Sequence, residues 1–291
     1  LDGSAPVAAR TKTKRRPKKP FATAASGDRM AHRSARVWAG WTPGIYSYKS
    51  TPCTEATGTC EPPDDSALDG YDFLKAEVNA ETVGTFSLGG EWFPFQDYVG
   101  IEAEYTRASY TTDFEADAGE GVSHCATHFC DTMNYINIGA QGRFALLKAK
   151  GPLDLLVRAG ASIQDVVVFW GRPDAAGGKE PRCETISLVG LRVGAGLRYT
   201  VTPKIQPHFN YNITFGLRAS LDGNGFAVPG VINHGVVGGV TFFPWKGLML
   251  DASYSGLTRA LGLSFEEAGV VQRGTLSEAS HSIRLSAGWA F

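Results

Sequence analysis

From residue 35 to residue 291 the chain repeats one pattern, in which apolar and polar residues alternate at a period of two. The clearest case is KIQPHFNYNITFGLRAS, residues 204–220, where Ile205 and Phe209 fall on one face and His208 on the other. A period of two is the repeat of a β-strand, whose successive side chains point to opposite faces. Each such segment therefore has one apolar and one polar face.

The segments with this pattern are long. Their lengths, about 13–18 residues, exceed the five or six residues usual in globular sheets and cover the 9–11 residues of a tilted strand that crosses a bilayer. No apolar run of about 18 residues is present, which excludes a transmembrane helix. The ten predicted strands are residues 35–48, 81–93, 98–114, 133–148, 153–170, 184–200, 204–220, 230–244, 247–261 and 277–291.

The connections between these strands alternate between short and long. Such alternation is typical of an outer-membrane barrel, with short turns on one side and long loops on the other, and a soluble sandwich does not require it. We therefore predict an all-β, up-and-down antiparallel transmembrane barrel of about ten strands. The short connections are 93–97, 148–152, 202–204 and 244–247, and the long ones are 49–80, 115–132, 171–183, 221–229 and 262–276.

Aromatic residues gather where the strands meet the short turns, and the chain ends on HSIRLSAGWAF. Tyr and Trp favour a membrane interface, because the ring can lie in lipid while the polar atom meets water. With these features, residues 35–291 resemble the small outer-membrane β-barrel proteins of Gram-negative bacteria. We expect the final strand to close the sheet against the first strand, near Val37 and Trp41.

The resemblance implies a bacterial outer-membrane location, with contacts to outer-membrane lipid and lipopolysaccharide. It also implies that the barrel-assembly machinery recognises the last strand. The residues that would carry this assembly signal are Ile283, Leu285, Ala287, Trp289 and Phe291.

If the apolar residues of each strand face lipid, the residues between them face the lumen. The opposite register would expose charges to hydrocarbon at a cost of about 2–4 kcal/mol for each Arg or Lys. Because ten strands are close to the eight-stranded barrel that side chains fill, we favour a lumen filled by ion pairs. A small pore that the excess of Arg makes selective for anions is the alternative. The predicted luminal charges are Glu91, Glu102, Glu104, Arg143, Asp154, Arg158, Arg192, Arg198, His208, Arg218, Asp251 and Arg284.

All five cysteines fall in the predicted long loops. Close pairs of cysteines in exposed loops favour disulfides in an oxidising compartment, here Cys53–Cys60 and Cys125–Cys130. His124 and His128 beside the second pair could instead contribute to a zinc site, but the spacing matches no strong zinc motif. We assign no metal and no cofactor, and Cys183 receives no role.

Residues 1–34 are rich in Ala, Lys, Arg and Pro and lack an apolar period, which predicts a disordered periplasmic tail or linker. Its cations could contact anionic lipid headgroups or an acidic envelope protein. The net charge of −1 and the compartment do not favour a nucleic-acid partner. The predicted contact residues of the tail are Lys12, Lys14, Arg15, Arg16, Lys18 and Lys19.

A catalytic site at the barrel rim would need a nucleophile with a base, or paired acids that hold a water molecule. His281 and Ser282 are adjacent on a strand, so their side chains point to opposite faces. We therefore expect no enzyme, but a structural or interaction role with a filled lumen and long extracellular loops. A narrow diffusion channel, or the barrel subunit of a trans-envelope complex docked through the basic tail, are the alternatives.

Overall fold

The computed structural model describes residues 34–53, 72–73, 75–95, 98–111, 114–117, 122–125, 132–147, 152–173, 179–221, 224–226, 232–267 and 270–291. Every element in these ranges is a β-strand. None of the described segments is a helix of the length and hydropathy that crossing a membrane requires. The strands are β1 (Ala35–Trp41), β2 (Gly44–Cys53), β3 (Asp72–Phe73), β4 (Lys75–Phe95), β5 (Val99–Thr111), β6 (Phe114–Asp117), β7 (Val122–Cys125), β8 (Thr132–Leu147), β9 (Leu153–Pro173), β10 (Lys179–Tyr199), β11 (Ile205–Leu221), β12 (Asn224–Phe226), β13 (Ile232–Phe242), β14 (Leu248–Glu267) and β15 (Val270–Ala290).

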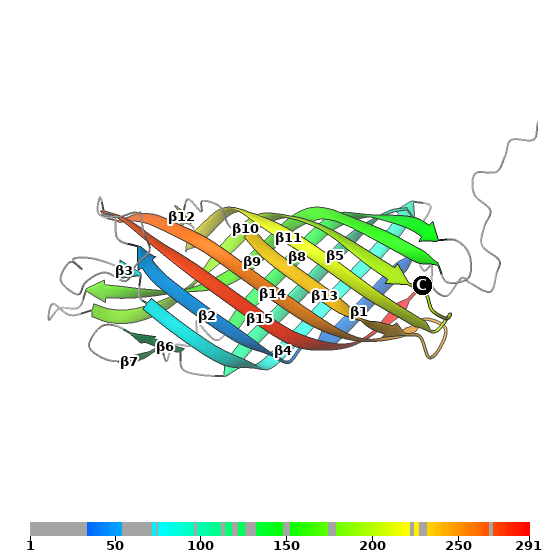
Figure 1. Ribbon diagram of the computed structural model, residues 1–291, viewed down its shortest axis with the longest axis horizontal. Helices are drawn as coiled ribbons and strands as arrows, with labels where there is room; N and C mark the ends of the chain where they lie inside the picture. The colour runs from blue at the N-terminus through cyan, green and yellow to red at the C-terminus, as the bar shows by residue number, and fades with distance from the viewer. Residues whose placement is uncertain are drawn as a thin grey trace, which may run out of the picture.

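The long strands form one closed antiparallel barrel of ten strands, as predicted (Figure 1). Nine of them, from β4 to β15, pair with their neighbours in chain order, and β1 and β2 together form the tenth. β1 pairs with β15 and β4 near the short turns, and β2 pairs with the same two strands further along. The predicted closing contacts are confirmed, because Val37 pairs with Trp289 and Trp41 with Leu285.

The tenth strand is interrupted at Thr42 and Pro43, between β1 and β2. Proline has no N–H to donate to the ladder. The wall nevertheless stays hydrogen-bonded, because the Thr42 N–H donates to the Thr85 carbonyl at 3.1 Å. On the other side, the Ile283 N–H donates to the Pro43 carbonyl at 2.9 Å. The seam of the barrel is thus closed along its whole paired length.

Two of the predicted long connections are wrong, since much of 171–183 and of 262–276 is strand. The β9–β10 ladder continues to Pro173 paired with Lys179, and the β14–β15 ladder to Glu267 paired with Val270. These hairpins reach the end of the barrel opposite the C-terminus (Figure 1). The alternation of apolar and polar residues marks the part of a strand that contacts lipid. The hydrogen bonds of the ladder need only the backbone of the neighbouring strand, so the strands continue beyond the residues that alternate.

The outer surface of the barrel carries an apolar belt that faces away from the lumen. Its large side chains are strongly exposed, for example Ile101 at 54%, Leu285 at 48% and Leu191 at 46%. A continuous exposed belt of this kind is incompatible with water and matches the hydrocarbon layer of a bilayer. Towards the short turns the belt ends in exposed aromatic residues, namely Trp92, Tyr98, Phe242, Trp245, Trp289 and Phe291.

Near its other edge the belt carries three outward tyrosines, each hydrogen-bonded to a polar side chain on the next strand, and on β11 exposed apolar residues continue past Tyr211 to Phe215 and Leu217. In every case the partner lies two residues beyond the cross-strand neighbour of the tyrosine. This arrangement keeps the ring in lipid and satisfies the hydroxyl at the interface. We call this set the tyrosine ring: Tyr105 with Asn134 Oδ1 at 2.8 Å, Tyr211 with His234 Nδ1 at 2.7 Å, and Tyr254 with His281 Nδ1 at 2.6 Å.

Beyond the last outward apolar residues, such as Val189 on β10 and Leu217 on β11, the two faces of the strands exchange character. On β10 the outward residue Val189 is the last of the apolar belt, and Ser187 then takes the outward position. The alternate residues Leu188 and Ile186 point inward and are buried. The apolar side chains inside this upper part of the barrel form what we call the upper core: Tyr48, Ala108, Met133, Val166, Val168, Ile186, Leu188, Leu261 and Leu276. The upper barrel therefore has the distribution of a water-soluble protein, and the lower barrel that of a membrane protein.

This boundary can be tested with one added charge on each side of the tyrosine ring. Val193→Lys places an ammonium group in the apolar belt, and we expect the free energy of unfolding to fall by about 2–4 kcal/mol. Thr258→Lys lies beyond the ring and faces water, so it should change that free energy by no more than about 0.5 kcal/mol. Denaturant titration in phospholipid vesicles measures both, and equal losses would contradict the boundary.

Candidate functional site in the barrel lumen

The lumen is crossed by side-chain bonds at several levels, and the level nearest the short turns centres on Glu91. Its carboxylate accepts hydrogen bonds from both terminal nitrogens of Arg198, at 2.9 and 3.0 Å. Arg36 Nε lies 3.1 Å from the same carboxylate. β4 and β10, which carry Glu91 and Arg198, are separated by β5, β8 and β9, so this lower bridge spans the lumen.

Other side chains fill the space around the lower bridge. Arg36 also donates to Gln206 Oε1 across the barrel at 2.9 Å. Arg143, from the predicted set, is buried with its guanidinium 4.3 Å from the centre of the Phe93 ring. Asp154 is buried at the same end of the barrel. The short-turn end of the lumen is therefore packed with charged and aromatic groups.

A middle bridge lies further into the barrel. Glu102 is held between Arg158 and Arg192, each at 2.8 Å. Arg284 on β15 donates to Glu104 on β5 at 2.8 Å, across the two barrel strands that lie between them. All of these residues belong to the predicted luminal set, and every carboxylate among them has a guanidinium partner.

Asp251 and His208 complete the middle level. Asp251 accepts hydrogen bonds from the hydroxyls of Thr241 at 2.8 Å and Ser253 at 2.9 Å. His208 Nδ1 lies 3.6 Å from the Asp251 carboxylate, and Arg284 lies 3.9 Å from it. The carboxylate is thus surrounded by donors rather than left bare in the lumen.

An upper bridge, which the sequence analysis missed, lies just below the upper core. Arg259 pairs with Glu278 at 2.9 Å and donates to Gln164 Oε1 at 2.8 Å. Asn233 donates to the same oxygen at 2.7 Å, and Tyr46 donates to Glu278 at 2.6 Å. Gln164 is on β9 and Arg259 on β14, so this bridge also crosses the barrel.

The signal for these residues was present in the sequence. Arg259 and Glu278 occupy the same alternate positions as the predicted luminal charges Asp251 and Arg284 of their strands, and Arg36 alternates with the apolar Val37 and Ala39 of the first strand. Applying the alternation to every charge of the ten predicted strands would have included all three. Their partners across the barrel cannot be predicted from the sequence. These contacts join strands that are not neighbours in the sheet, and no local sequence pattern shows which such strands face each other.

Arg218 is a correction to the predicted luminal set, because it faces the outer surface. The pairing of β10 with β11 shifts between Val189 and Gly190, which pair with Arg218 and Gly216. A β-bulge of this kind inserts one residue, here Leu217, and reverses the faces beyond it. Arg218 therefore shares the outward face of Val189 and is exposed.

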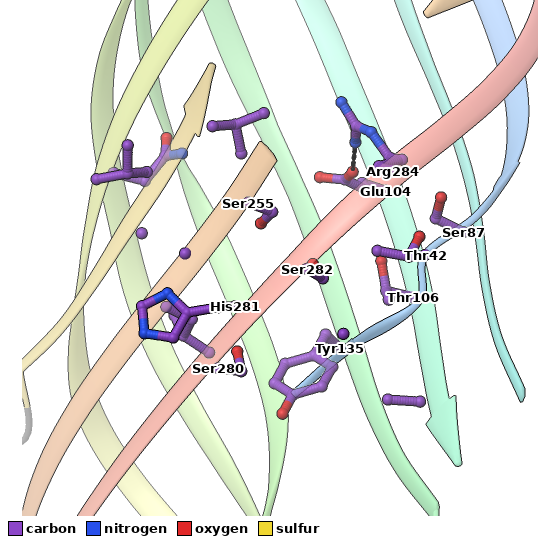
Figure 2. A pocket seen from close by; sticks show the side chains of 18 of the residues that line it. Thr42, Ser87, Glu104, Thr106, Tyr135, Ser255, Ser280, His281, Ser282 and Arg284 are labelled. Atoms are coloured by element: carbon purple, nitrogen blue, oxygen red, sulfur yellow. Dashed lines mark hydrogen bonds and ion pairs between the residues drawn. The ribbon is translucent and has the colours of Figure 1, made fainter. Parts of the chain in front are cut away.

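A cavity of about 180 Å³ lies between the middle and upper bridges (Figure 2). Ser255 and Ser282, which are cross-strand neighbours, line one wall, and Thr42 and Thr106 line another. A second cavity of about 100 Å³ lies on the other side of the middle bridge. These volumes suit small groups of water molecules and are below the range of about 300–1,000 Å³ usual for ligand pockets.

Ser280 and Ser282 face this cavity, but the histidine between them does not act with them. The side chain of His281 is exposed and is hydrogen-bonded to the outward Tyr254. A nucleophile and a base on opposite faces of one strand cannot exchange a proton directly. In the part of the chain that the structure describes, no group of three or more His, Cys, Asp or Glu residues could hold a metal ion.

The remaining predicted sites are placed only in part. Along β15 the predicted assembly signal is on the outer surface, with Ile283 at 57% exposure and Phe291 at 62%. Cys60 and Cys130 of the predicted disulfides lie outside the described residues, and so do the six tail cations Lys12, Lys14, Arg15, Arg16, Lys18 and Lys19. Of Cys53 and Cys125 only the backbone is described, at the ends of β2 and β7.

Comparison with known proteins places the chain by its fold. No family model and no curated protein sequence matches it. Among solved structures, the outer membrane protease OmpT from Escherichia coli is similar with a TM-score of 0.51 and 9% identity, covering 88% of this chain and 96% of that one. The outer membrane protein AlkL is 10% identical over 95% of this chain and 97% of its own, with a TM-score of 0.39. The fold is that of the small outer-membrane β-barrel proteins.

The lower bridge makes a prediction about stability. Glu91→Gln leaves two buried guanidinium groups without their shared carboxylate, so we expect the free energy of unfolding to fall by about 3–5 kcal/mol. Glu104→Gln is the matched control, because that side chain is 27% exposed whereas Glu91 is 4% exposed. The free energy of unfolding should fall clearly less in Glu104→Gln than in Glu91→Gln. A loss for Glu91→Gln no greater than for the control would show that the bridge does not stabilise the barrel.

Proposed function

We propose that the protein is an integral outer-membrane barrel of a Gram-negative bacterium with a structural or interaction role, and that its lumen is closed to diffusion. One observation carries the proposal: side-chain bridges cross the lumen at three levels, through Glu91, Glu102 and Gln164. The apolar belt on the outer surface supports the membrane location.

A diffusion channel would require a continuous water path, and the bridges oppose one. An ion that moves along the axis would have to displace the Glu91–Arg198 and Arg259–Gln164 contacts and then pass the upper core. The two cavities are separated by the Arg284–Glu104 and Arg192–Glu102 pairs. Ten strands are close to the size at which side chains fill a barrel, whereas wide pores need about sixteen.

The long hairpins supply the surface for interaction. From Thr258 paired with Ala279, the β14–β15 ladder continues to Glu267 paired with Val270, about 30 Å further along the strand. The β9–β10 ladder similarly continues from Asp165 past the tyrosine ring. A rigid ladder beyond the membrane can present its tips to a partner without the ordering cost of a free loop. We assign this end to the extracellular side, because outer-membrane barrels have short periplasmic turns.

The basic tail belongs to the opposite side in this arrangement. β1 begins and β15 ends at the short-turn end of the barrel, where Arg36 pairs with Ala290. We therefore assign residues 1–34 to the periplasm as a tail or linker that precedes the barrel of residues 35–291. Its cations would meet anionic headgroups or an acidic envelope protein. A barrel subunit docked through this tail into a trans-envelope complex is the second form of the interaction role.

The outward residues of β15 suit two further partners. Leu285 and Trp289 are exposed along the seam, and Phe291 is exposed at its end. A strand end of this kind is available to the barrel-assembly machinery before the barrel closes and to lipid afterwards. The role we propose is not catalytic, since Ser282 and His281 lie on opposite faces of the wall.

Conductance across a planar bilayer tests the closed lumen. Because three bridges and the upper core block the axis, we expect purified protein to give no stable ion steps, while a porin in the same bilayer gives large ones. Heat-dependent electrophoretic mobility of the same sample shows that the barrel is folded. Reproducible unitary steps from the folded protein would replace this proposal by the diffusion-channel alternative.

Copurification from native membranes tests the interaction role. Three chains are compared: the full chain, a chain without residues 1–33, and a chain whose β14–β15 hairpin is shortened by removing Phe265–Gln272. If the hairpins hold a partner, the hairpin variant alone should lose it, and if the tail docks into an envelope complex, the tail variant alone should lose that complex. Identical partner lists from all three would contradict both interaction surfaces.

A further inference from the structure

The outer face of the seam carries an apolar groove of about 860 Å³, whose lining also includes the luminal-face residues Thr85, Asp251 and Ser286. The floor of the groove is formed by alanine side chains of the belt, and large aromatic side chains flank it. The floor residues are Ala39, Ala252 and Ala287, and the rings are those of Trp41, Phe86 and Phe242.

The strand register explains the shape of this groove. Ala39 on β1 pairs with Ala287 on β15. Ala252 on β14 pairs with Leu285, two residues from Ala287, so the small residues follow a diagonal across three strands. Trp41 is 54% exposed and Phe242 is 41% exposed, so the rings project beside a floor that no side chain covers. The groove lies within the apolar belt, where the only solvent is hydrocarbon.

The short turn between Phe242 and Leu250, which both line the groove, carries an exposed lysine, and so does the neighbouring turn. Lys204 and Lys246 are exposed in two neighbouring short turns, which the Phe243 N–H joins by donating to the Lys204 carbonyl at 2.8 Å. Residues 202–204 and 244–247 contain no acid. Each lysine can therefore interact with an anionic group at the membrane surface, without a competing carboxylate in its own turn.

An indole lies beside these lysines. Trp289 packs against Gly247, the residue after Lys246, so closely that a Cβ at this position would clash with the indole. Gly247 has a φ of +92°, which only glycine adopts readily. The turn is thus packed against the indole, and Trp289 lies two residues along β15 from Ala287 of the groove floor.

We propose that this surface is a binding site for one glycerophospholipid. An acyl chain lies over Ala39, Ala252 and Ala287, and the phosphate lies at Lys204 and Lys246. A cation at the headgroup level and an apolar groove directly above it match the two ends of such a lipid. The proposal rests on the membrane location proposed above but not on the closed lumen, so bilayer conductance cannot decide it.

Native mass spectrometry of the full chain in detergent, titrated with dioleoyl phosphatidylglycerol, tests the site. We expect a one-to-one adduct whose affinity falls at least tenfold in Ala252→Phe, which fills the floor, and in the double variant Lys204→Glu, Lys246→Glu. The matched controls are Ala195→Phe, which faces lipid on β10, and Lys49→Glu, near the opposite end of the barrel. Both should bind as the unaltered chain does.

Heat-dependent mobility of every variant separates a lost site from a lost barrel. Folded variants that all bind the lipid equally, or a loss as large in Ala195→Phe as in Ala252→Phe, would overturn the site while leaving the membrane location intact. A dimer that Ala252→Phe abolishes, in place of a lipid adduct, would assign the groove to a second copy of the chain and overturn the proposal as well.

Discussion

The structure depends on a change of solvent along its strands. Below the tyrosine ring the outward side chains meet hydrocarbon, so polar groups must turn inward and bond to one another. Beyond the last outward apolar residues, such as Val189 and Leu217, the outward side chains meet water, and the apolar residues turn inward to form the upper core. The same backbone ladders run through both regions. Each β-strand has two faces, and the solvent outside the barrel determines which of them is apolar.

The charged lumen follows from this constraint. Buried ion pairs seldom stabilise a protein more than well-packed apolar residues would, but removing one partner is costly. In the lower barrel, polar luminal residues keep each strand in its register, because a shift by one residue would put Arg36 or Glu91 into lipid. The cross-lumen contacts of Glu91 and Glu102 then hold opposite walls together. Closure of the lumen is a consequence of this arrangement in a barrel of only ten strands.

Much of the lower barrel could be predicted from the sequence, because its alternation reports contact with lipid. The alternation predicts the ten strands, and together with the resemblance to small outer-membrane barrels it predicts the closing seam at Val37 and Trp41. Where the outer solvent changes, the alternation no longer marks the strands, so the sequence predicts loops at 171–183 and 262–276, where the structure has extended hairpins. Arg218 was misplaced because a bulge at Leu217 leaves no local mark in the alternation. Bridges such as Arg259–Gln164 join strands that are not neighbours, so they can be identified only from the structure of the closed barrel.

Spin labels placed along β14 and β15 in a chain whose native cysteines are replaced test the solvent boundary most directly. Oxygen concentrates in hydrocarbon and a nickel chelate stays in water, so their collision rates report the solvent at each label. We predict that labels at 248, 250 and 252 collide mainly with oxygen, that labels at 258 and 260 collide mainly with the chelate, and that a label at 276 collides with neither. Oxygen-dominated collisions that continue through 260, or free access of the chelate to 276, would contradict a membrane barrel that continues into a water-soluble one.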